Sequence, residues 1–417
     1  MNKHLKVLVI SSTYPPMTSG GADYAFRLCQ KLVSRGAEVH VLTSKLESYP
    51  EYQGLTVYPW IKHWTWLSLP RVLKIILELR PDVINLHYAG NIYDDHPMIC
   101  LLPSILSCLG QKYRLVTLIE NALPARVYLC SLPVRSFHKL LSKIWGRDKF
   151  DYGFGTLIND SESIIALSEQ DIETLELHCA GAAKKCHLIP PPPLMRIETN
   201  NREAKRQEVR REFNIPTEAI LIAYSGYIYP GKGLETLLSA FALLRKSQEQ
   251  PASAKQDIRL IIIGGIPEIM LEFYNRKNFL NELKSQAEQL GIAQFISWTG
   301  GYDVESPMPS LYLNAADIAI LPFDGGVRLA NSSFGSVASH GLPIITTQSA
   351  KLESAFRNEE NVLLVKPGDH SALANATERL LNDQALRHKL SLGAQQLAKD
   401  WFNWDSAADK ILSLLKA

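Results

Sequence analysis

The chain has 417 residues, about three times the usual length of one domain, so we expect two or three packed units. Hydrophobic residues make up 46% and charged residues 21%, which excludes a largely disordered or collagen-like chain. Lys plus Arg number 44 against 42 Asp plus Glu, so no overall positive field selects nucleic acid as a partner.

The cysteines and the apolar runs indicate where the protein resides. The six cysteines form no C-x-x-C pair and no regular spacing with histidine, which indicates reduced, buried thiols rather than a zinc site or a disulfide framework. The first apolar run is too short for a signal peptide. Residues 99–109 contain Pro103 and fall short of the roughly 20 residues that cross a bilayer. We therefore expect a cytoplasmic protein without a membrane-spanning helix.

Short β-branched runs alternate with amphipathic runs along the first half of the chain. A strand at 5–10, a helix at 22–34 and a strand at 38–43 predict a βαβ beginning. Further elements are predicted as a helix at 71–79 and strands at 83–86, 115–119, 164–167 and 187–189. Strands that are apolar on both faces are typical of a parallel sheet covered by helices.

Four consecutive prolines at residues 190–193 predict a stiff extended segment, and we place a domain boundary there. The same alternation then restarts, with strands at 220–224, 259–263, 295–299, 318–321, 343–347 and 362–365 and helices at 234–246, 279–290 and 332–340. We predict two α/β domains, residues 1–192 and 193–398. The remaining residues, 399–417, have a helical apolar pattern that needs a partner surface.

Three loops between a strand and a helix have the residues to bind an anion. In the first, Gly20 and Gly21 precede a helix, where free N–H groups favour a phosphate, although a plain turn is an equal alternative. In the second, Lys232 follows Gly226 by six positions, and its cation and the nearby backbone donors can share one anionic ligand, although a solvated turn lysine is an equal alternative. Neither loop has the spacing of a dinucleotide fingerprint or a Walker motif.

The third loop follows the strand at 318–321. Gly325 and Gly326 bend the chain, Arg328 offers a planar fork for phosphate, and Asn331 or Ser332 is predicted to cap the next helix. A surface arginine without a ligand is the alternative for Arg328. Loops at the carboxyl ends of parallel strands are where open α/β sheets bind ligands.

These loops together resemble the retaining, nucleotide-sugar-dependent glycosyltransferases of the GT-B fold, family 4 (group 1), over nearly the whole chain. The segments that carry the resemblance are Tyr14-Pro-Pro with Gly20-Gly21, Tyr224-Ser-Gly with Lys232-Gly-Leu-Glu, Leu260-Ile-Ile-Ile-Gly-Gly, Ile296-Ser-Trp-Thr-Gly, Asn314-Ala-Ala-Asp-Ile and His340-Gly-Leu-Pro-Ile-Ile. The resemblance implies two Rossmann-like domains that face each other across a cleft, with acceptor in the first and donor in the second. It also implies that the last helix, residues 399–417, crosses back to the first domain.

The resemblance implies the site residues as well. The donor would bind to Gly20, Gly21, Gly226, Lys232, Trp298, Thr299, Gly300, Arg328, Asn331, Ser332 and Ser333. The candidate catalytic residues are Arg328, Lys232, Glu120 and His87, and Asn121 and His96 are further acceptor-side candidates, chosen because they follow strands of the first domain or lie in its loops. A structural role is the favoured alternative for His87, and a helix start is an equal alternative for His96. No metal or cofactor is expected, because the adjacent acidic pair Asp94-Asp95 lies in the wrong domain for the donor.

The chain departs from the family pattern at two places. The family has two glutamates eight positions apart before its Gly-Leu-Pro segment, and here Arg328 and Ser336 occupy those positions. The family's histidine after a Val-Thr-like strand is replaced by Ile119. We predict that Arg328 contacts phosphate instead, since electrostatic stabilisation of a leaving diphosphate can supply much of the rate.

Three functions remain open from the sequence. The first is an active, retaining, metal-independent glycosyltransferase that uses a nucleoside-diphosphate sugar and an unidentified glycan, lipid-linked or small-molecule acceptor. The second is a protein of the same fold that binds nucleotide-sugar or glycan without turnover, which the missing glutamates favour. The third is another enzyme of the fold, such as a sugar-nucleotide epimerase or a phosphorylase.

A basic amphipathic segment begins at Arg135 and ends at Lys149. It places Phe137, Leu140 and Trp145 on one helical stripe with lysines elsewhere. Such a helix can lie on an anionic membrane at the inner face, and packing of the stripe against the first domain is the favoured alternative.

Overall fold

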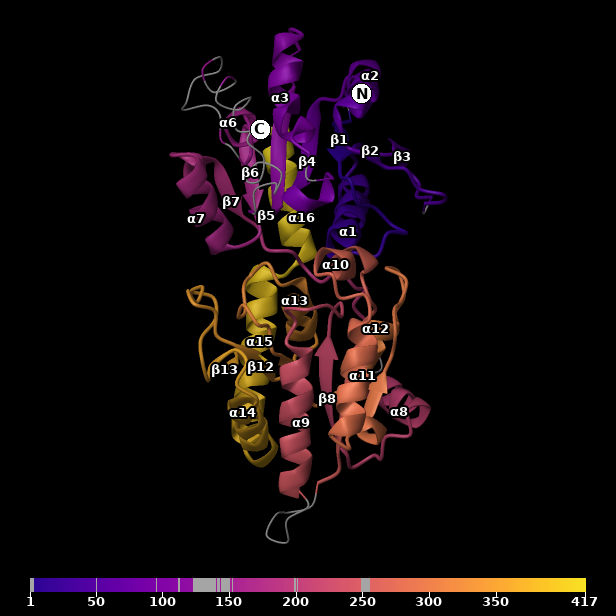
Figure 1. Cartoon of the computed structure of the whole chain (residues 1–417), viewed down its shortest axis with the longest axis vertical. Coiled ribbons are helices and arrows are strands. Elements are labelled where there is room, and N and C mark those ends of the chain that lie inside the picture. The colour runs from indigo at the N-terminus through magenta and orange to yellow at the C-terminus, as the bar shows by residue number, and fades with distance from the viewer. Residues whose placement is uncertain are drawn as a thin grey trace. The chain divides into compact units, whose positions relative to one another are not determined.

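The computed structural model describes residues 4–49, 51–94, 96–111, 113–122, 140, 143, 151, 153–198, 200, 202–248 and 256–417. The chain divides into two compact units (Figure 1). Unit 1 consists of residues 1–17, 21–190 and 404–417, and unit 2 of residues 18–20 and 191–403. Most of the predicted segment 135–149 lies outside the described residues.

Unit 1 contains a parallel seven-stranded sheet in the order β3-β2-β1-β4-β5-β6-β7. Its strands are β1 (Lys6–Ile10), β2 (Glu38–Ser44), β3 (Leu55–Ile61), β4 (Val83–Ala89), β5 (Arg114–Asn121), β6 (Ser163–Ala166) and β7 (Cys186–Leu188). Because all the strands run the same way, their carboxyl ends meet at one edge of the sheet.

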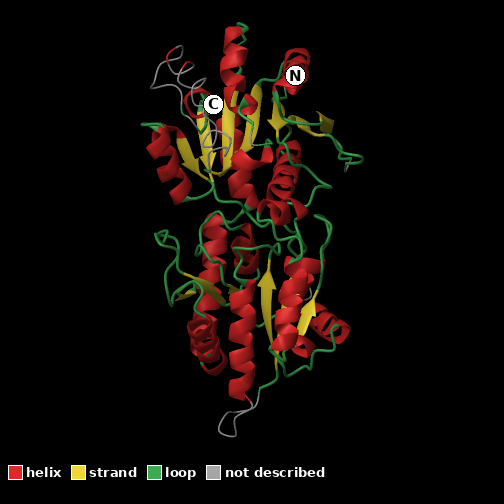
Figure 2. Ribbon diagram, in the orientation of Figure 1, coloured by secondary structure: helices red, strands yellow, loops and turns green. Residues whose placement is uncertain are grey.

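The helices of unit 1 are α1 (Gly20–Ser34), α2 (Leu69–Leu79), α3 (Met98–Cys108), α6 (Leu157–Asp160), α7 (Glu169–His178) and α16 (Trp404–Lys416). Helices flank the sheet in the ribbon view (Figure 2). One face of the sheet contributes Leu8, Ile10 and Leu86 to a buried core with residues from α2, α3 and α6. The alternation of side chains along a strand sends Val7 and Val9, which are also fully buried, to the other face.

Unit 2 contains a parallel six-stranded sheet in the order β10-β9-β8-β11-β12-β13. Its strands are β8 (Ile220–Ser225), β9 (Ile258–Ile263), β10 (Ile296–Trp298), β11 (Ile318–Leu321), β12 (Ile344–Thr347) and β13 (Leu363–Val365). Its helices are α8 (Arg202–Glu212), α9 (Leu234–Gln248), α10 (Glu268–Phe273), α11 (Phe279–Gln289), α12 (Met308–Ala315), α13 (Ser332–Ser339), α14 (His370–Asn382) and α15 (Gln384–Trp401). The two sheets confirm the predicted α/β class.

Several predicted elements need correction. Strand β3 was not predicted, and β4 extends to Ala89, so that His87 lies inside a strand and not after it. The helix predicted at residues 399–417 is α16, which begins later, at Trp404, because α15 ends at Trp401 and residues 402 and 403 are not helical. Among the described cysteines the expected burial is wrong for Cys108, which is exposed. No described helix has the length and apolar character to span a membrane.

Candidate functional site

The loop between β8 and α9 in unit 2 is shaped by glycines with positive φ. Gly226 has a φ of 141° and Gly233 a φ of 72°, in the range that favours glycine. A Cβ at position 233 would collide with the backbone carbonyl of Pro322, so the loop before α9 packs directly on the loop after β11. The amide of Asp324 donates to the carbonyl of Gly231 at 3.1 Å and ties the same two loops together.

Lys232 lies between these two loops and is half-buried. Its Nζ is 4.8 Å from the ring centre of Tyr229 and 5.2 Å from that of Phe323. The two ring faces hold the ammonium group by cation–π attraction without neutralising its charge. The arrangement places a positive charge at the carboxyl edge of the sheet, beside the start of α9.

The loop that contains Arg328 is fastened to β12 and to the segment after it. The amide of Val327 donates to the carbonyl of Thr347 at 2.8 Å, and the amide of Leu329 donates to the carboxylate of Glu353. Glu353 is 3% exposed and was not singled out from the sequence. The sequence shows it only as a charged residue in the loop after the strand at 344–347, and charged residues are common in loops.

The start of α13 differs from the prediction. Asn331 occupies the N-cap position, but neither it nor Ser332 caps the helix, because the Asn331 Oδ1 accepts the backbone N–H of Arg328 at 2.7 Å instead. Ser333, in the first turn, lies close to Gly226, where an added Cβ would be 3.2 Å from the Ser333 Cβ. Ser336 is buried, and its hydroxyl donates to the carbonyl of Ser332 at 3.0 Å.

The remaining donor-side candidates lie after β9 and β10. Thr299 follows β10, and its Oγ1 accepts the amide of Gly264 at 3.3 Å. Gly264 and Gly300 form an antiparallel bridge, and a Cβ at Gly264 would collide with the carbonyl of Gly226. Trp298, the last residue of β10, is half-buried. The structure therefore brings the loops of Gly226, Lys232, Thr299 and Ser333 to one edge of the unit 2 sheet.

His87 and Glu120 form a buried polar pair in unit 1. The Nδ1 of His87 is 4.0 Å from the Oε1 of Glu120, and neither atom has a hydrogen-bond partner. His87 is fully buried, and the Glu120 side chain is 15% exposed. Burial lowers the pKa of His87 to about 3 and raises the pKa of Glu120 to about 7.

The hydrogen bonds of His87 determine which of its nitrogens carries the hydrogen. The Nδ2 of Asn85 donates to the carbonyl of Val116 at 3.0 Å, which turns the Asn85 Oδ1 toward the His87 Nε2, 3.0 Å away. The Nε2 must therefore carry the hydrogen of the neutral ring, and the Nδ1 is left as an acceptor. Two acceptors, Nδ1 and the Glu120 carboxylate, face each other without a hydrogen between them unless Glu120 is protonated or a ligand donates one.

Two more features border this pair. The ring of Tyr24, from α1, is 5.9 Å from the His87 ring, and its buried hydroxyl has no partner. Gly21, near the start of α1, packs on Glu120, since an added Cβ would lie 3.0 Å from the Glu120 carboxyl carbon and closer still to an oxygen. We call Tyr24, His87 and Glu120, with the glycine beside them, the unit 1 polar cluster.

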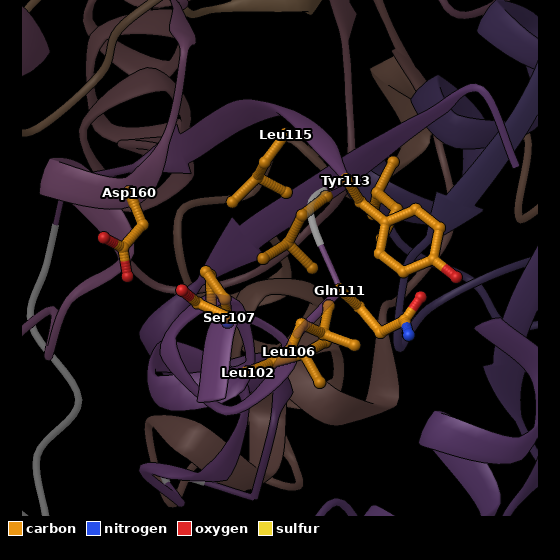
Figure 3. A pocket seen from close by; sticks show the side chains of 10 residues that line it. Leu102, Leu106, Ser107, Gln111, Tyr113, Leu115 and Asp160 are labelled. Atoms are coloured by element: carbon orange, nitrogen blue, oxygen red, sulfur yellow. The ribbon is translucent and has the colours of Figure 1, made fainter. Parts of the chain in front are cut away.

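The other acceptor-side candidates are less involved. His96 accepts the amide of Met98 at 3.2 Å at the start of α3 and packs against the ring of Trp66, which is a structural role. Asn121 ends β5 and is half-buried. A separate hollow of about 190 Å³ lies on the α3 side of the sheet (Figure 3). Most of the side chains that line it are apolar, and Gln111, Tyr113 and Asp160 add polar groups. None of the predicted site residues lines that hollow.

The four predicted catalytic residues thus fall into two pairs. His87 and Glu120 belong to unit 1, whereas Lys232 and Arg328 belong to unit 2. Within the described part of the chain, no group of three or more His, Cys, Asp or Glu side chains has the arrangement to hold a metal ion.

Known proteins resemble both halves of the chain. Residues 18–192 match the family model described as Glycosyltransferase Family 4, and residues 205–397 match the model described as Glycosyl transferases group 1. A D-inositol 3-phosphate glycosyltransferase of Jonesia denitrificans is 28% identical over 271 residues, which are 62% of this chain and 57% of that protein. One from Salinispora tropica is 34% identical over 212 residues, 49% of this chain and 40% of the relative. The match therefore spans about half the length of these curated relatives.

Solved structures share the architecture. HepE of Anabaena, in complex with UDP and glucose, has a TM-score of 0.70 at 15% identity and covers 99% of this chain and 100% of its own. Sucrose-phosphate synthase of Thermosynechococcus elongatus has a TM-score of 0.67 at 19% identity, with 98% of both chains covered. Matches to both halves of the sequence, together with two parallel sheets, show that the chain belongs to the group 1 glycosyltransferases of the GT-B fold.

Proposed function

We propose that the protein transfers a sugar from a nucleoside-diphosphate sugar to an acceptor hydroxyl. Residues 193–398 would bind the donor and residues 1–192 the acceptor. The observation that carries the proposal is the facing pair of buried acceptor atoms, His87 Nδ1 and Glu120 Oε1, within a chain of this family. A substrate hydroxyl supplies the hydrogen that the two atoms lack, which is what a sugar acceptor brings. HepE of Anabaena, which shares the fold, is in complex with UDP and glucose, and this supports a nucleotide-sugar donor.

On the donor side, we assign the diphosphate to the edge of the unit 2 sheet. Lys232 provides a cation, and the amide of Ser333 in the first turn of α13, close to Gly226, provides a backbone donor. An anion is favoured at a helix start next to a cation. In this proposal Arg328 adds a second cation where the family has a glutamate, and Thr299 and Gly300 line the nucleoside side.

The reaction breaks the bond between the anomeric carbon and the diphosphate oxygen, and the diphosphate leaves with the electron pair. A bond forms between the acceptor oxygen and the anomeric carbon, and the acceptor proton passes to an oxygen of the leaving phosphate. Lys232 and Arg328 stabilise the charge that develops there. His87 and the Glu120 carboxylate accept hydrogen bonds and orient the acceptor. We propose that the product retains the donor's anomeric configuration and that no metal takes part.

The test is a panel of UDP-, GDP- and ADP-sugars measured by thermal shift and by slow hydrolysis of the donor. We expect one donor class to raise the unfolding temperature. Lys232→Ala should weaken its binding about tenfold or more, because a hydrogen bond to a charged group contributes roughly 1.5–3 kcal/mol. Lys246→Ala, on the exposed side of α9, is the matched control and should bind as wild type.

Arg328→Ala is expected to slow donor turnover, and Arg357→Ala, whose side chain pairs with Glu360 on the surface, is expected to leave it unchanged. An Arg328→Ala protein with unchanged turnover would refute the role given to this arginine. Proton NMR of the product distinguishes retention from inversion, and activity that survives chelation of divalent ions would support metal independence.

One observation favours a second function. Ser336 bonds within its own helix, so the position of the family's second glutamate offers no carboxylate. A protein that binds nucleotide-sugar without turnover would show a thermal shift and no hydrolysis under any condition. An epimerase would convert the donor with no acceptor present.

A further inference from the structure

A group of apolar side chains is exposed where β3 passes into α2. Leu67 is 94% exposed, and Trp60 and Trp66 are 42% and 39% exposed. They are the two tryptophans among the exposed large apolar residues of the described chain. Single apolar side chains scattered over a surface are normal, whereas a group of them marks an interaction site. We call Trp60, Lys62, Trp66, Leu67 and Arg71 the tryptophan patch.

The patch is continuous. Trp66 and Leu67 form the turn η1 (Trp66–Ser68), which leads directly into α2. Arg71, in the first turn of α2, donates from its guanidinium to the carbonyl of Trp60 at 2.8 Å. This bond fastens the end of β3 to the start of α2 and joins the two segments that carry the tryptophans.

The charge around the patch is positive. No Asp or Glu occurs from residue 52 to residue 77, whereas this stretch contains Lys62, Arg71 and Lys74. Two acidic groups face it from outside: Asp94 lies 3.9 Å from the ring of His63, and Glu78 lies 3.8 Å from Lys74. Lys62 and Arg71 are exposed, and their charges have no acidic partner among the described ion pairs, so the centre of the patch stays cationic.

Three kinds of partner would cover exposed aromatic side chains. A second chain that adds a strand to the sheet needs a free edge, but β3 has Pro59 near its middle, which lacks an N–H. A glycan stacks on aromatic rings and accepts hydrogen bonds from lysine and arginine, but it offers no apolar phase for a fully exposed leucine. An anionic lipid surface fits all the features, because Trp lies at the headgroup level, Leu enters the acyl boundary and cations pair with phosphates.

We propose that the tryptophan patch docks unit 1 on a lipid bilayer that contains anionic headgroups. The placement relates this surface to the site: the patch follows the carboxyl end of β3, the same edge of the sheet as the unit 1 polar cluster. Buried Trp64, between the exposed tryptophans in sequence, packs 4.9 Å from the ring of Tyr93, whose hydroxyl donates to the carbonyl of His87 at 2.6 Å. The proposal is independent of the transfer reaction and concerns only where the protein resides while it works.

The test is flotation of the full-length protein with phosphatidylcholine vesicles, with and without phosphatidylglycerol. We expect binding that requires phosphatidylglycerol, falls with added salt and shifts tryptophan emission to shorter wavelength. Leu67→Ser should weaken vesicle binding about tenfold, because burying a leucine side chain is worth roughly one factor of ten or more. Lys62→Glu should weaken binding further, by about fivefold for each unit of charge removed.

The matched control is Leu177→Ser, since Leu177 is 88% exposed on α7, which joins β6 to β7 at the opposite end of the sheet from β3. It should bind as wild type, and both leucine variants should keep the wild-type unfolding temperature because neither side chain is packed. Absence of flotation, or flotation that Leu67→Ser and Lys62→Glu leave intact, overturns the proposal and directs attention to residues 135–149. Loss of self-association or of polysaccharide binding in Leu67→Ser, with vesicle binding unchanged, overturns it in favour of a protein or glycan partner.

Discussion

Glu120 determines which residue can stand at position 21. Its carboxylate occupies the space where the side chain of residue 21 would begin, so a side chain at this position requires the Glu120 carboxylate to move. Position 21 is the second residue of α1, and glycine in a helix is less favourable than alanine, by about 1 kcal/mol in a helix interior. Two residues far apart in the sequence therefore depend on each other.

The contact predicts a non-additive pair of substitutions. Gly21→Ala alone should destabilise unit 1 by about 1–3 kcal/mol, because the new methyl group has to displace a buried carboxylate. In the Glu120→Ala background the same change should be neutral or stabilising by up to about 1 kcal/mol. Chemical denaturation of the four proteins checks this. Gly325→Ala, where an added Cβ meets nothing, is the control, and equal effects of Gly21→Ala in both backgrounds would contradict the contact.

The raised pKa of Glu120 predicts a pH-dependent stability. The folded protein holds the Glu120 proton up to a pKa of about 7, whereas the unfolded chain releases it near 4.5, so wild-type stability from this group falls as pH rises between those values. Glu120→Gln removes that contribution. The stability of the variant relative to wild type should increase by about 3 kcal/mol from pH 4.5 to above pH 7.

Unfolding measured for both proteins over this pH range tests the prediction. The lowered pKa of His87 acts in the opposite direction, because a buried neutral ring costs stability at low pH. Both proteins contain His87, so its contribution largely cancels in the difference between their stabilities. A difference that does not change with pH would mean that Glu120 titrates at its ordinary value.

Residue patterns in the sequence identify some of these side chains and not others. Lys232 is predictable because it stands between glycines at a strand-to-helix turn, and the loop lies where expected. Glu353 is not predictable, because its role depends on the amide of Leu329, which the fold alone brings near. Asn331 illustrates a competition that local rules do not resolve: its side chain serves the loop before the helix and not the helix itself.

At the scale of elements, apolar periodicity predicts most strands and fails where the pattern is mixed. Strand β3 alternates between buried and partly exposed residues and contains Pro59, as expected for a strand at the edge of a sheet. The helix predicted at residues 399–417 begins at Trp404, since the chain leaves the helical conformation at residues 402 and 403. Phe402, which follows α15, is buried, and its ring packs 5.9 Å from that of Phe334.

Helix α16 is attached to unit 1 by a buried apolar stripe and by exposed ion pairs. Ile411 is fully buried, and Arg35 of α1 pairs with Asp409 at 2.6 Å near the surface. Ile411→Ala should destabilise unit 1 by about 2–4 kcal/mol, since it leaves a cavity. Asp409→Ala should cost about 0.5 kcal/mol, because exposed ion pairs contribute little. Urea denaturation ranks the two, with exposed Lys410→Ala as the control, and a larger effect at Asp409 would reverse this assignment.

At the scale of the whole molecule, the division of the chain predicts which unit depends on its last residues. Arg114 of β5 donates to the carbonyls of Leu414 and Leu415 at 3.1 and 2.9 Å, so α16 completes unit 1. Removal of residues 404–417 should increase hydrogen exchange in β5 and α1 and leave β8 and β11 protected. Mass spectrometry of peptides from both units checks this, and equal loss in the two units would contradict it.

The return of α16 to unit 1 also has a consequence for biosynthesis. The ribosome makes every strand of unit 1 before unit 2 but makes α16 after it. Unit 2 can therefore fold as soon as its own residues have emerged. Unit 1 waits until residues 404–417 appear, and until then the apolar surface that α16 will cover stays open. Translation speed through the unit 2 coding region thus sets how long that surface is exposed to chaperones and to aggregation.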